Sequence, residues 1–134
     1  MSADPAASGT AVVEELGRRF RAGDGEGARA LFHPDLRVHQ PASLPHGGWH
    51  EGAAGMAAMG ATFASHWDRT LGGASVHGCG DTVVQVTVQT WTAKATGRSA
   101  TVEVVELFAF TDGLISEIRV FQEDTHALLN TLDA

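Results

Sequence analysis

The chain of 134 residues has little that could cross-link it or give it positive charge. It contains one cysteine, Cys79, which excludes an intrachain disulfide, and a lone thiol fits a reducing compartment. Nine basic residues, of which only Lys94 is a lysine, stand against 16 acidic ones, and the net charge is −7. Nucleic acids and anionic membrane surfaces both need a clustered basic footprint. We therefore expect neither as a partner.

Signals for targeting and for membrane insertion are also missing. The first ten residues, MSADPAASGT, have no basic region and no apolar run, so they do not look like a signal peptide. No window reaches the ~18 apolar residues of a membrane span. The sequence predicts a cytoplasmic protein with a disordered tail over residues 1–9. Residues 10–134 are expected to form a single domain, which at this length can build a core without disulfides.

Three segments carry the apolar spacing of helices. The first is expected to begin near Ser8 or Thr10, either of which can cap it, and to end at Gly23. Asp24 is expected to cap a short second helix that ends at Pro34. The third covers residues 52–67, where one stripe of side chains recurs at helical spacing: Met56, Met59, Phe63 and Trp67.

The second half of the chain has the composition of strands, with β-branched runs separated by the turn sequences ATGRS and TDG. Strands are expected over 36–40, 70–78, 82–94, 100–110 and 114–122, and a last helix over 125–132. Helices followed by an antiparallel meander are typical of an α+β fold. We expect helices on the concave face of a curved antiparallel sheet, with a pocket at the uncovered end.

The period-two alternation of strands predicts which side chains point into this pocket. In residues 100–110 the more aromatic face is placed inside, and it contains a single carboxylate, Glu106. Its neighbours on that face are apolar: Val102, Val104, Phe108 and Phe110. In residues 82–94 the inward face has two amides and the large aromatic ring: Gln85, Gln89 and Trp91.

The opposite face of residues 82–94 is flat and β-branched, with Val84, Val86 and Val88. Both faces of this strand therefore look at least half buried. Because a domain of this size cannot cover both faces of its sheet with its own elements, we predict a homodimer that packs through the outer face.

The stretch 38-VHQPASLPHGGWHEG-52 holds three histidines in fifteen residues. Three histidines can ligate a metal, but His39, His46 and His50 have neither HxH spacing nor the HExxH motif. We expect no metal here and interpret Pro45 and the glycines as a turn at the rim of the pocket. Gln40 is predicted to face inward and His39 outward, although a shift of one residue in register would exchange them.

Three segments resemble the nuclear transport factor 2-like superfamily: FRAGDGEGARALFHPDLRVHQP at 20–41, SLPHGGWHEGAAGM at 44–57 and ELFAFTDGLISEIRVFQ at 106–122. This superfamily includes ketosteroid isomerases, SnoaL-like polyketide cyclases and limonene epoxide hydrolases. The resemblance covers roughly residues 10–130 and implies a cone-shaped, strongly bent sheet, a deep pocket and a dimer. The same scaffold hosts many activities, so the resemblance alone implies no particular one.

The resemblance also relates individual positions to chemistry. Where ketosteroid isomerases have a carboxylate base this chain has Gln40, and where they have a tyrosine it has Leu16. The position of their neutral aspartic acid corresponds to Glu106. SnoaL-like cyclases commonly place an aspartate on the last strand, where this chain has Ile118 or Val120. The Asp–Arg–Asp set of the epoxide hydrolases is not found on one face, so no relative's mechanism transfers whole.

Two functional hypotheses follow. In the first, the protein is an isomerase or cyclase that transfers a proton on a small, apolar, carbonyl-bearing molecule of polyketide or steroid type, without a cofactor. Glu106 is then the acid or base and Gln40 orients the carbonyl. The substrate-binding candidates are Leu16, Met56, Met59, Phe63, Gln89, Trp91, Phe108, Val120 and Gln122, with His39 and His66 as further candidates.

In the second hypothesis, the protein binds such a ligand without changing it, as the missing base and tyrosine suggest. A third possibility is a dimerisation module whose pocket is filled by its own side chains.

Overall fold

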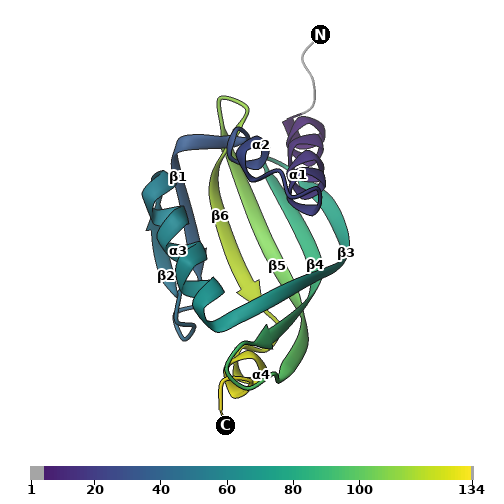
Figure 1. The fold of residues 1–134 in the computed structure, drawn as a ribbon. Coiled ribbons are helices and arrows are strands. Elements are labelled where there is room, and N and C mark those ends of the chain that lie inside the picture. The colour runs from purple at the N-terminus through teal and green to yellow at the C-terminus, as the bar shows by residue number, and fades with distance from the viewer. Residues whose placement is uncertain (1–4, 134) are drawn as a thin grey trace.

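The computed structural model describes residues 5–133 and contains four helices and one six-stranded sheet (Figure 1). The helices are α1 (Pro5–Arg21), α2 (Gly25–Arg29), α3 (Gly52–His66) and α4 (Thr125–Asn130). The strands are β1 (Phe32–Gln40), β2 (Gly48–Glu51), β3 (Trp67–Cys79), β4 (Thr82–Ala93), β5 (Ser99–Thr111) and β6 (Leu114–Gln122). None of the helices formed by the described residues is long and apolar enough to cross a membrane.

The sheet has the order β2-β1-β6-β5-β4-β3. Its neighbours are antiparallel except for β1 and β6, which are parallel. A hairpin would force these two strands to run in opposite directions, but four strands and a helix separate them along the chain. The prediction of an α+β fold built on a curved antiparallel sheet is confirmed, except that it did not include the parallel pair of β1 and β6.

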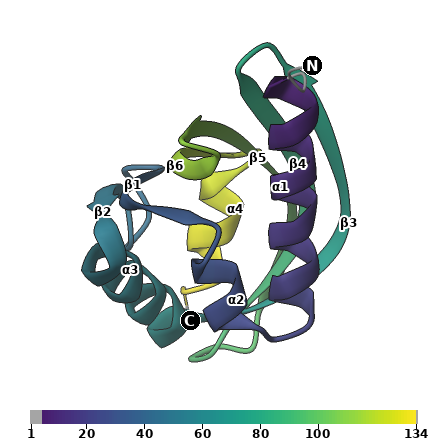
Figure 2. The ribbon, with the colours of Figure 1, turned by 90° about the horizontal axis from the view of Figure 1, so that it is seen from above.

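Helices cover the concave face of this sheet. Helix α1 packs against β3 and β4, and α3 packs against β1, β2 and the start of β3. Seen from above, the sheet curves around an interior that α1 and α3 flank, with α2 between them (Figure 2). The short α4 lies at the start of β5, where the buried Trp67 Nε1–H donates a 2.8 Å hydrogen bond to Thr131 Oγ1. The interior of the curved sheet is therefore enclosed on two sides by α1 and α3.

The start of α1 differs from the prediction. Residues 5–9 belong to the helix and not to a disordered tail, whereas residues 1–4 lie outside the described part of the chain. Proline is well tolerated in the first turn of a helix because its missing N–H would have no partner there. Gly9 then lets the helix approach the sheet, because a Cβ at this position would lie 2.9 Å from Phe110 Cε2 and 3.0 Å from Val83 Cγ2.

The second helix is shorter than predicted. The Asp24 carboxylate caps α2 as expected and accepts a 2.8 Å hydrogen bond from the Gly27 N–H, but the helix ends at Arg29 instead of Pro34. Pro34 lies inside β1, where the pairing with β6 is irregular between Phe32 and Arg37. A proline is acceptable there because an irregular pairing needs no ladder hydrogen bond from its nitrogen.

The loop before α3 also contains an unpredicted strand, because residues 48–51 form β2 and pair with β1. Gly47 precedes this strand in a tight turn. A Cβ at Gly47 would lie 2.5 Å from the backbone oxygen of Pro41 and 2.8 Å from that of Ala42. Backbone atoms cannot rotate away as a side chain can, so this position needs glycine.

Replacement of Gly47 by Ala should therefore lower the free energy of unfolding by about 1–3 kcal/mol, the usual cost of overpacking. Gly60→Ala is the matched control, because a Cβ at Gly60 in α3 meets nothing within 4 Å. That variant should gain about 0.5–1 kcal/mol from better helix propensity. Urea unfolding of both variants measures the difference, and equal effects would contradict the close approach at Gly47.

Candidate functional site

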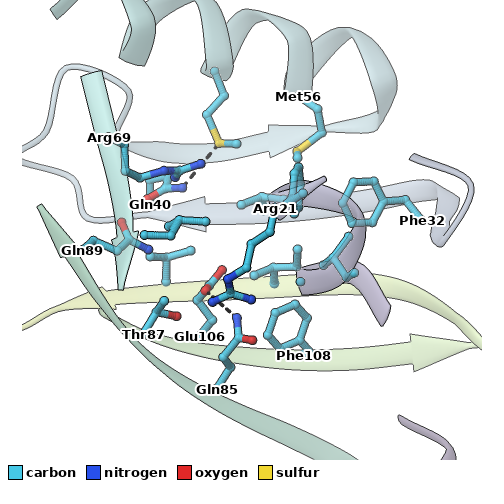
Figure 3. A pocket seen from close by; sticks show the side chains of 18 residues that line it. Arg21, Phe32, Gln40, Met56, Arg69, Gln85, Thr87, Gln89, Glu106 and Phe108 are labelled. Atoms are coloured by element: carbon cyan, nitrogen blue, oxygen red, sulfur yellow. Dashed lines mark hydrogen bonds between the residues drawn. The ribbon is translucent and has the colours of Figure 1, made fainter. Parts of the chain in front are cut away.

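The interior of the cone holds a cavity with two adjoining lobes, and Figure 3 shows the first of them. The first lobe, of about 170 Å³, lies toward α1, and the second, of about 260 Å³, lies toward α3 and Trp91. Both lobes are lined by the same central group: Phe20, Gln40, Met56, Met59, Arg69, Gln89, Glu106 and Val120. The cavity is therefore open inside and is not filled by the side chains around it.

Eleven residues proposed as catalytic or substrate-binding line one or both lobes. Gln40, Met56, Met59, Gln89, Glu106 and Val120 line both lobes, Leu16 and Phe108 line the first, and Phe63, Trp91 and Gln122 line the second. They come from α1, α3 and four strands, so only the folded sheet brings them together.

The structure does not bring His39 or His66 to the cavity. His39 lies on the outer side of β1, where its ring is 4.8 Å from that of Trp49. His66 ends α3, and its Nδ1 lies 2.9 Å from the Thr62 carbonyl and 3.0 Å from Ser65 Oγ. Both histidines thus contact other residues of the protein outside the cavity. Among the described residues, no three of His, Cys, Asp and Glu form a group that could hold a metal ion.

Glu106 is the acidic group of the cavity. Strand alternation points it inward beside the buried Val104 and Phe108, and the pairing of β5 places it between Gln85 on β4 and Val120 on β6. The Gln85 Nε2–H donates a 3.1 Å hydrogen bond to Glu106 Oε1. Burial raises the pKa of Glu106, while this hydrogen bond and the charge of Arg69 act in the opposite direction. A carboxyl group with a raised pKa is a stronger base than an exposed carboxylate, so Glu106 is suited to exchange a proton with a bound molecule.

Arg69 is a second charged group of the cavity, and the sequence interpretation missed it. It lies on β3 opposite Trp91, and its guanidinium carbon is 5.3 Å from the centre of the Phe63 ring. Arg69 is exposed to solvent and also lines both lobes of the cavity. The strand was expected to begin at residue 70; a start at Trp67 would have placed Trp67, Arg69 and Leu71 on the inward face.

Two amides present donors or acceptors to the cavity. The Trp91 Nε1–H donates a 2.9 Å hydrogen bond to Gln89 Oε1. Because an indole N–H can only donate, this bond fixes the amide and leaves the Gln89 NH₂ group directed elsewhere. The Gln40 side chain makes one weak contact, from its Nε2–H to Met59 Sδ at 3.5 Å. This contact leaves the side-chain carbonyl oxygen of Gln40 free to accept a hydrogen bond. Gln40 and Gln89 can thus both orient a polar group of a ligand.

His46 is a further residue that the sequence interpretation placed in a turn at the rim. It is only 4% exposed, and its ring lies 5.4–6.1 Å from the rings of Phe63, Trp67 and Trp91. Burial, with smaller effects from His50, His66 and Arg69, lowers the pKa of His46 to about 4. The imidazole is therefore neutral at pH 7. A loop has no periodicity that could have shown this burial.

The architecture is that of the nuclear transport factor 2-like proteins. Their cone-shaped α+β fold encloses its interior as this chain does. The family model of the SnoaL-like domain matches residues 13–118, so the chain belongs to this family. No curated protein is significantly similar to it in sequence.

Solved structures agree with this fold. A nuclear transport factor 2-like protein of unknown function from Burkholderia pseudomallei superposes with a TM-score of 0.83 at 25% identity over 100% of both chains. TerC, crystallised together with polyporic acid, gives a TM-score of 0.84 at 22% identity, covering 95% of this chain and 99% of TerC. A candidate polyketide cyclase from Xanthomonas campestris gives 0.80 at 16% identity, covering 96% and 99%. These similarities show the fold of the chain, and any inference about its chemistry rests on the residues of the cavity.

Proposed function

We propose that this protein is a cofactor-independent enzyme of the isomerase or cyclase type, which moves a proton on a small, largely apolar, carbonyl-bearing molecule. The observation that carries the proposal is Glu106, a carboxyl group with a raised pKa on the wall of an open apolar cavity. Solved neighbours described as candidate polyketide cyclases are consistent with a ligand of that class.

The reaction can be written with the groups of the cavity. The Glu106 carboxylate takes a proton from the carbon next to the substrate carbonyl, and the electron pair of that C–H bond moves to the carbonyl oxygen as an enolate forms. The amides of Gln40 and Gln89 hold this oxygen by hydrogen bonds. Glu106 then returns the proton to another carbon. In the cyclase variant, the enolate carbon attacks a second carbonyl carbon of the same molecule, the π pair of that C=O bond moves to its oxygen, and this oxygen takes the proton from Glu106. Met56, Phe63 and Phe108 form the apolar wall that excludes water.

The test is exchange of hydrogen for deuterium. Small polycyclic ketones that raise the melting temperature of the protein are incubated with it in D₂O, and NMR follows loss of the signal from hydrogens next to the carbonyl. Catalysed exchange supports proton transfer. Ligands that stabilise the protein but never exchange would instead favour the second hypothesis, a binding protein. That alternative has its own support, because Gln40 stands where a base is found in ketosteroid isomerases.

We also propose that the protein forms a homodimer through the outer face of its sheet. Val86, Val105 and Phe121 are cross-strand neighbours there, and Val88 and Phe121 are 38% and 43% exposed. No described helix packs over this face, and an exposed apolar patch of this kind is typical of an interface. The cytoplasmic location and the absence of nucleic-acid partners stay predictions from the sequence.

If the outer face is the interface, Phe121→Glu should raise the dimer dissociation constant by about 100-fold or more, because an unpaired charge would be buried. Light scattering after size-exclusion chromatography measures the change. Ala57→Glu adds the same charge at an exposed position of α3 and should leave the dimer intact. A wild-type protein that is monomeric at all concentrations tested would reject the interface.

A further inference from the structure

Arg69 is a cation in the cavity whose donors are not used by the protein. Among residues 5–133, its guanidinium forms no hydrogen bond or ion pair, and its recorded contact is the face of the Phe63 ring at 5.3 Å. An arginine stays charged at all physiological pH values and has five N–H donors in a rigid fork. Since the group lines both lobes, these donors are available to a ligand.

Arg69 and Glu106 do not form an ion pair. The two groups influence one another electrostatically, yet they make no ion pair, and Glu106 is instead hydrogen-bonded to Gln85. If Arg69 served only to hold Glu106 in place, a direct contact between them would be expected. Since no ion pair joins them, each group can contact a ligand with its own polar atoms.

The polar and apolar groups of the first lobe are segregated. In Figure 3, Gln40, Arg69 and Gln89 lie toward one side and Phe32 and Met56 toward the other, with Glu106, Gln85 and Arg21 between them. A cavity of this kind fits an amphipathic ligand with one polar end. Its size sets the scale of that ligand, because a ~150 Å³ cavity holds benzene and these lobes measure about 170 and 260 Å³.

We propose that the ligand of this cavity is a compact acid, whose carboxylate or similarly ionised oxygen is bound by Arg69 while its apolar ring body extends toward Phe32 and Met56. The proposal rests on the function proposed above and narrows its substrate class from neutral ketones to keto acids or acidic enols. Gln40 and Gln89 supply additional amide contacts at the same end. Glu106 then meets the atoms between the anionic end and the apolar body, where the proton is transferred.

A second arginine, Arg21, also lines the first lobe and is the competing anchor. It lies in the last turn of α1 and is exposed, as Arg69 is, and its Nη2–H donates a 3.3 Å hydrogen bond to the Gly72 carbonyl. Arg21 does not line the second lobe. Arg69, which lines both lobes, is therefore the better placed of the two for a ligand that spans them, and Arg21→Gln is the matched comparison for Arg69→Gln.

The experiment compares 2-naphthoate with 2-naphthamide, two probes of nearly equal shape of which only the first is ionised at pH 7.5. Titration calorimetry should show that the wild-type protein prefers the acid by about 10- to 100-fold, the range of a charge-assisted hydrogen-bonded pair. Arg69→Gln should remove this preference and leave the affinity for the amide within about twofold. Arg69→Lys should restore part of it, because the charge is kept without the planar fork.

Equal binding of the two probes, or no saturable binding of 2-naphthoate, would overturn the proposal. So would a loss of the preference in Arg21→Gln but not in Arg69→Gln. Melting temperatures close to that of the wild type show that each variant is folded, and the acid preference of the wild-type protein tests the idea even if Arg69→Gln does not fold. Neither probe has a hydrogen on the carbon next to its carbonyl, so absent exchange with ketones would refute the proposed chemistry without affecting this result.

Discussion

Replacement of Glu106 by Gln is expected to reduce catalysed hydrogen exchange on a ketone ligand by roughly 10²- to 10⁴-fold, the contribution typical of a positioned general base. Glutamine keeps the size of the side chain and can still hydrogen-bond to Gln85, but it cannot accept the proton. The affinity for the ligand should change much less than the rate. The measurement is the rate of signal loss in D₂O for the wild type and the variant at equal saturation.

The matched control is Glu103→Gln. Glu103 lies on the same strand β5 but on its exposed face, so removal of this carboxylate should not change the exchange rate. Loss of activity in Glu103→Gln would indicate an effect of net charge or of folding. An exchange rate in Glu106→Gln that equals the wild-type rate would reject Glu106 as the base and leave the cavity as a binding site.

The pH dependence of the rate should follow the same carboxyl group. Since burial raises the pKa of Glu106 above its ordinary value of 4.5, the basic form becomes available only as the pH rises through the raised value. Exchange should therefore increase with pH along a limb that lies above pH 4.5. The variant should lack this limb.

The stability of Glu106→Gln shows whether a loss of exchange comes from lost chemistry or from unfolding. A group with a raised pKa stabilises the fold fully below its unfolded value of 4.5, and this contribution is lost as the pH rises through the folded value. At pH 7 the charged form of Glu106 is thus a cost to the folded state, and Glu106→Gln should be at least as stable as the wild type. Loss of exchange in a variant with an unchanged or higher urea midpoint would be a loss of chemistry alone.

The sequence predicted the strand faces of this site well, because they follow a local rule. Alternation along 100–110 placed Glu106 and Phe108 inward, and alternation along 82–94 placed Gln89 and Trp91 inward, as the cavity has them. The same rule separated Gln40 from its neighbour His39, which lies on the outer side of β1. Period two needs only the correct register, and here the flanking prolines and turns fixed it.

The parts that the sequence did not predict depend on contacts between distant segments. Arg69 was missed because β3 starts directly after α3, and the two residues between Trp67 and the expected strand carried no clear pattern. Strand β2 has four residues, too few for a periodic signal, and it exists because β1 supplies its partner. His46 lies in a turn whose burial is determined by the aromatic rings from α3, β3 and β4 that surround it.

His46 makes the stability of the fold sensitive to acid. In the folded state its ring is enclosed by aromatic side chains, and its Nδ1 has no hydrogen-bond partner among the described residues. The ring therefore resists protonation until about pH 4, while the unfolded chain takes up the proton near pH 6.5. His50, His66 and Arg69 add repulsion to the protonated form. Between these two pH values the unfolded state binds more protons than the folded state.

The sign of the effect follows from this difference. The stabilisation is fully present above pH 6.5 and is lost as the pH falls toward 4, and a shift of this size corresponds to roughly 3 kcal/mol at most. The raised pKa of Glu106 opposes the change above pH 4.5, because its contribution grows as the pH falls. The wild-type stability curve alone therefore does not isolate His46, and a variant without the ring nitrogens is needed.

His46→Phe keeps an aromatic ring of similar size but cannot be protonated. Its free energy of unfolding should therefore fall less between pH 7.5 and acidic pH than that of the wild type. Urea unfolding from pH 4 to 7.5 gives the difference in free energy between the two proteins, which should change by about 2–3 kcal/mol across this window in favour of the variant at low pH. His46→Gln, which also lacks a titrating ring, should show the same change even if its packing is worse at every pH. Parallel stability curves for the wild type and both variants would mean that the His46 ring takes up its proton without cost, which its enclosure by Phe63, Trp67 and Trp91 argues against.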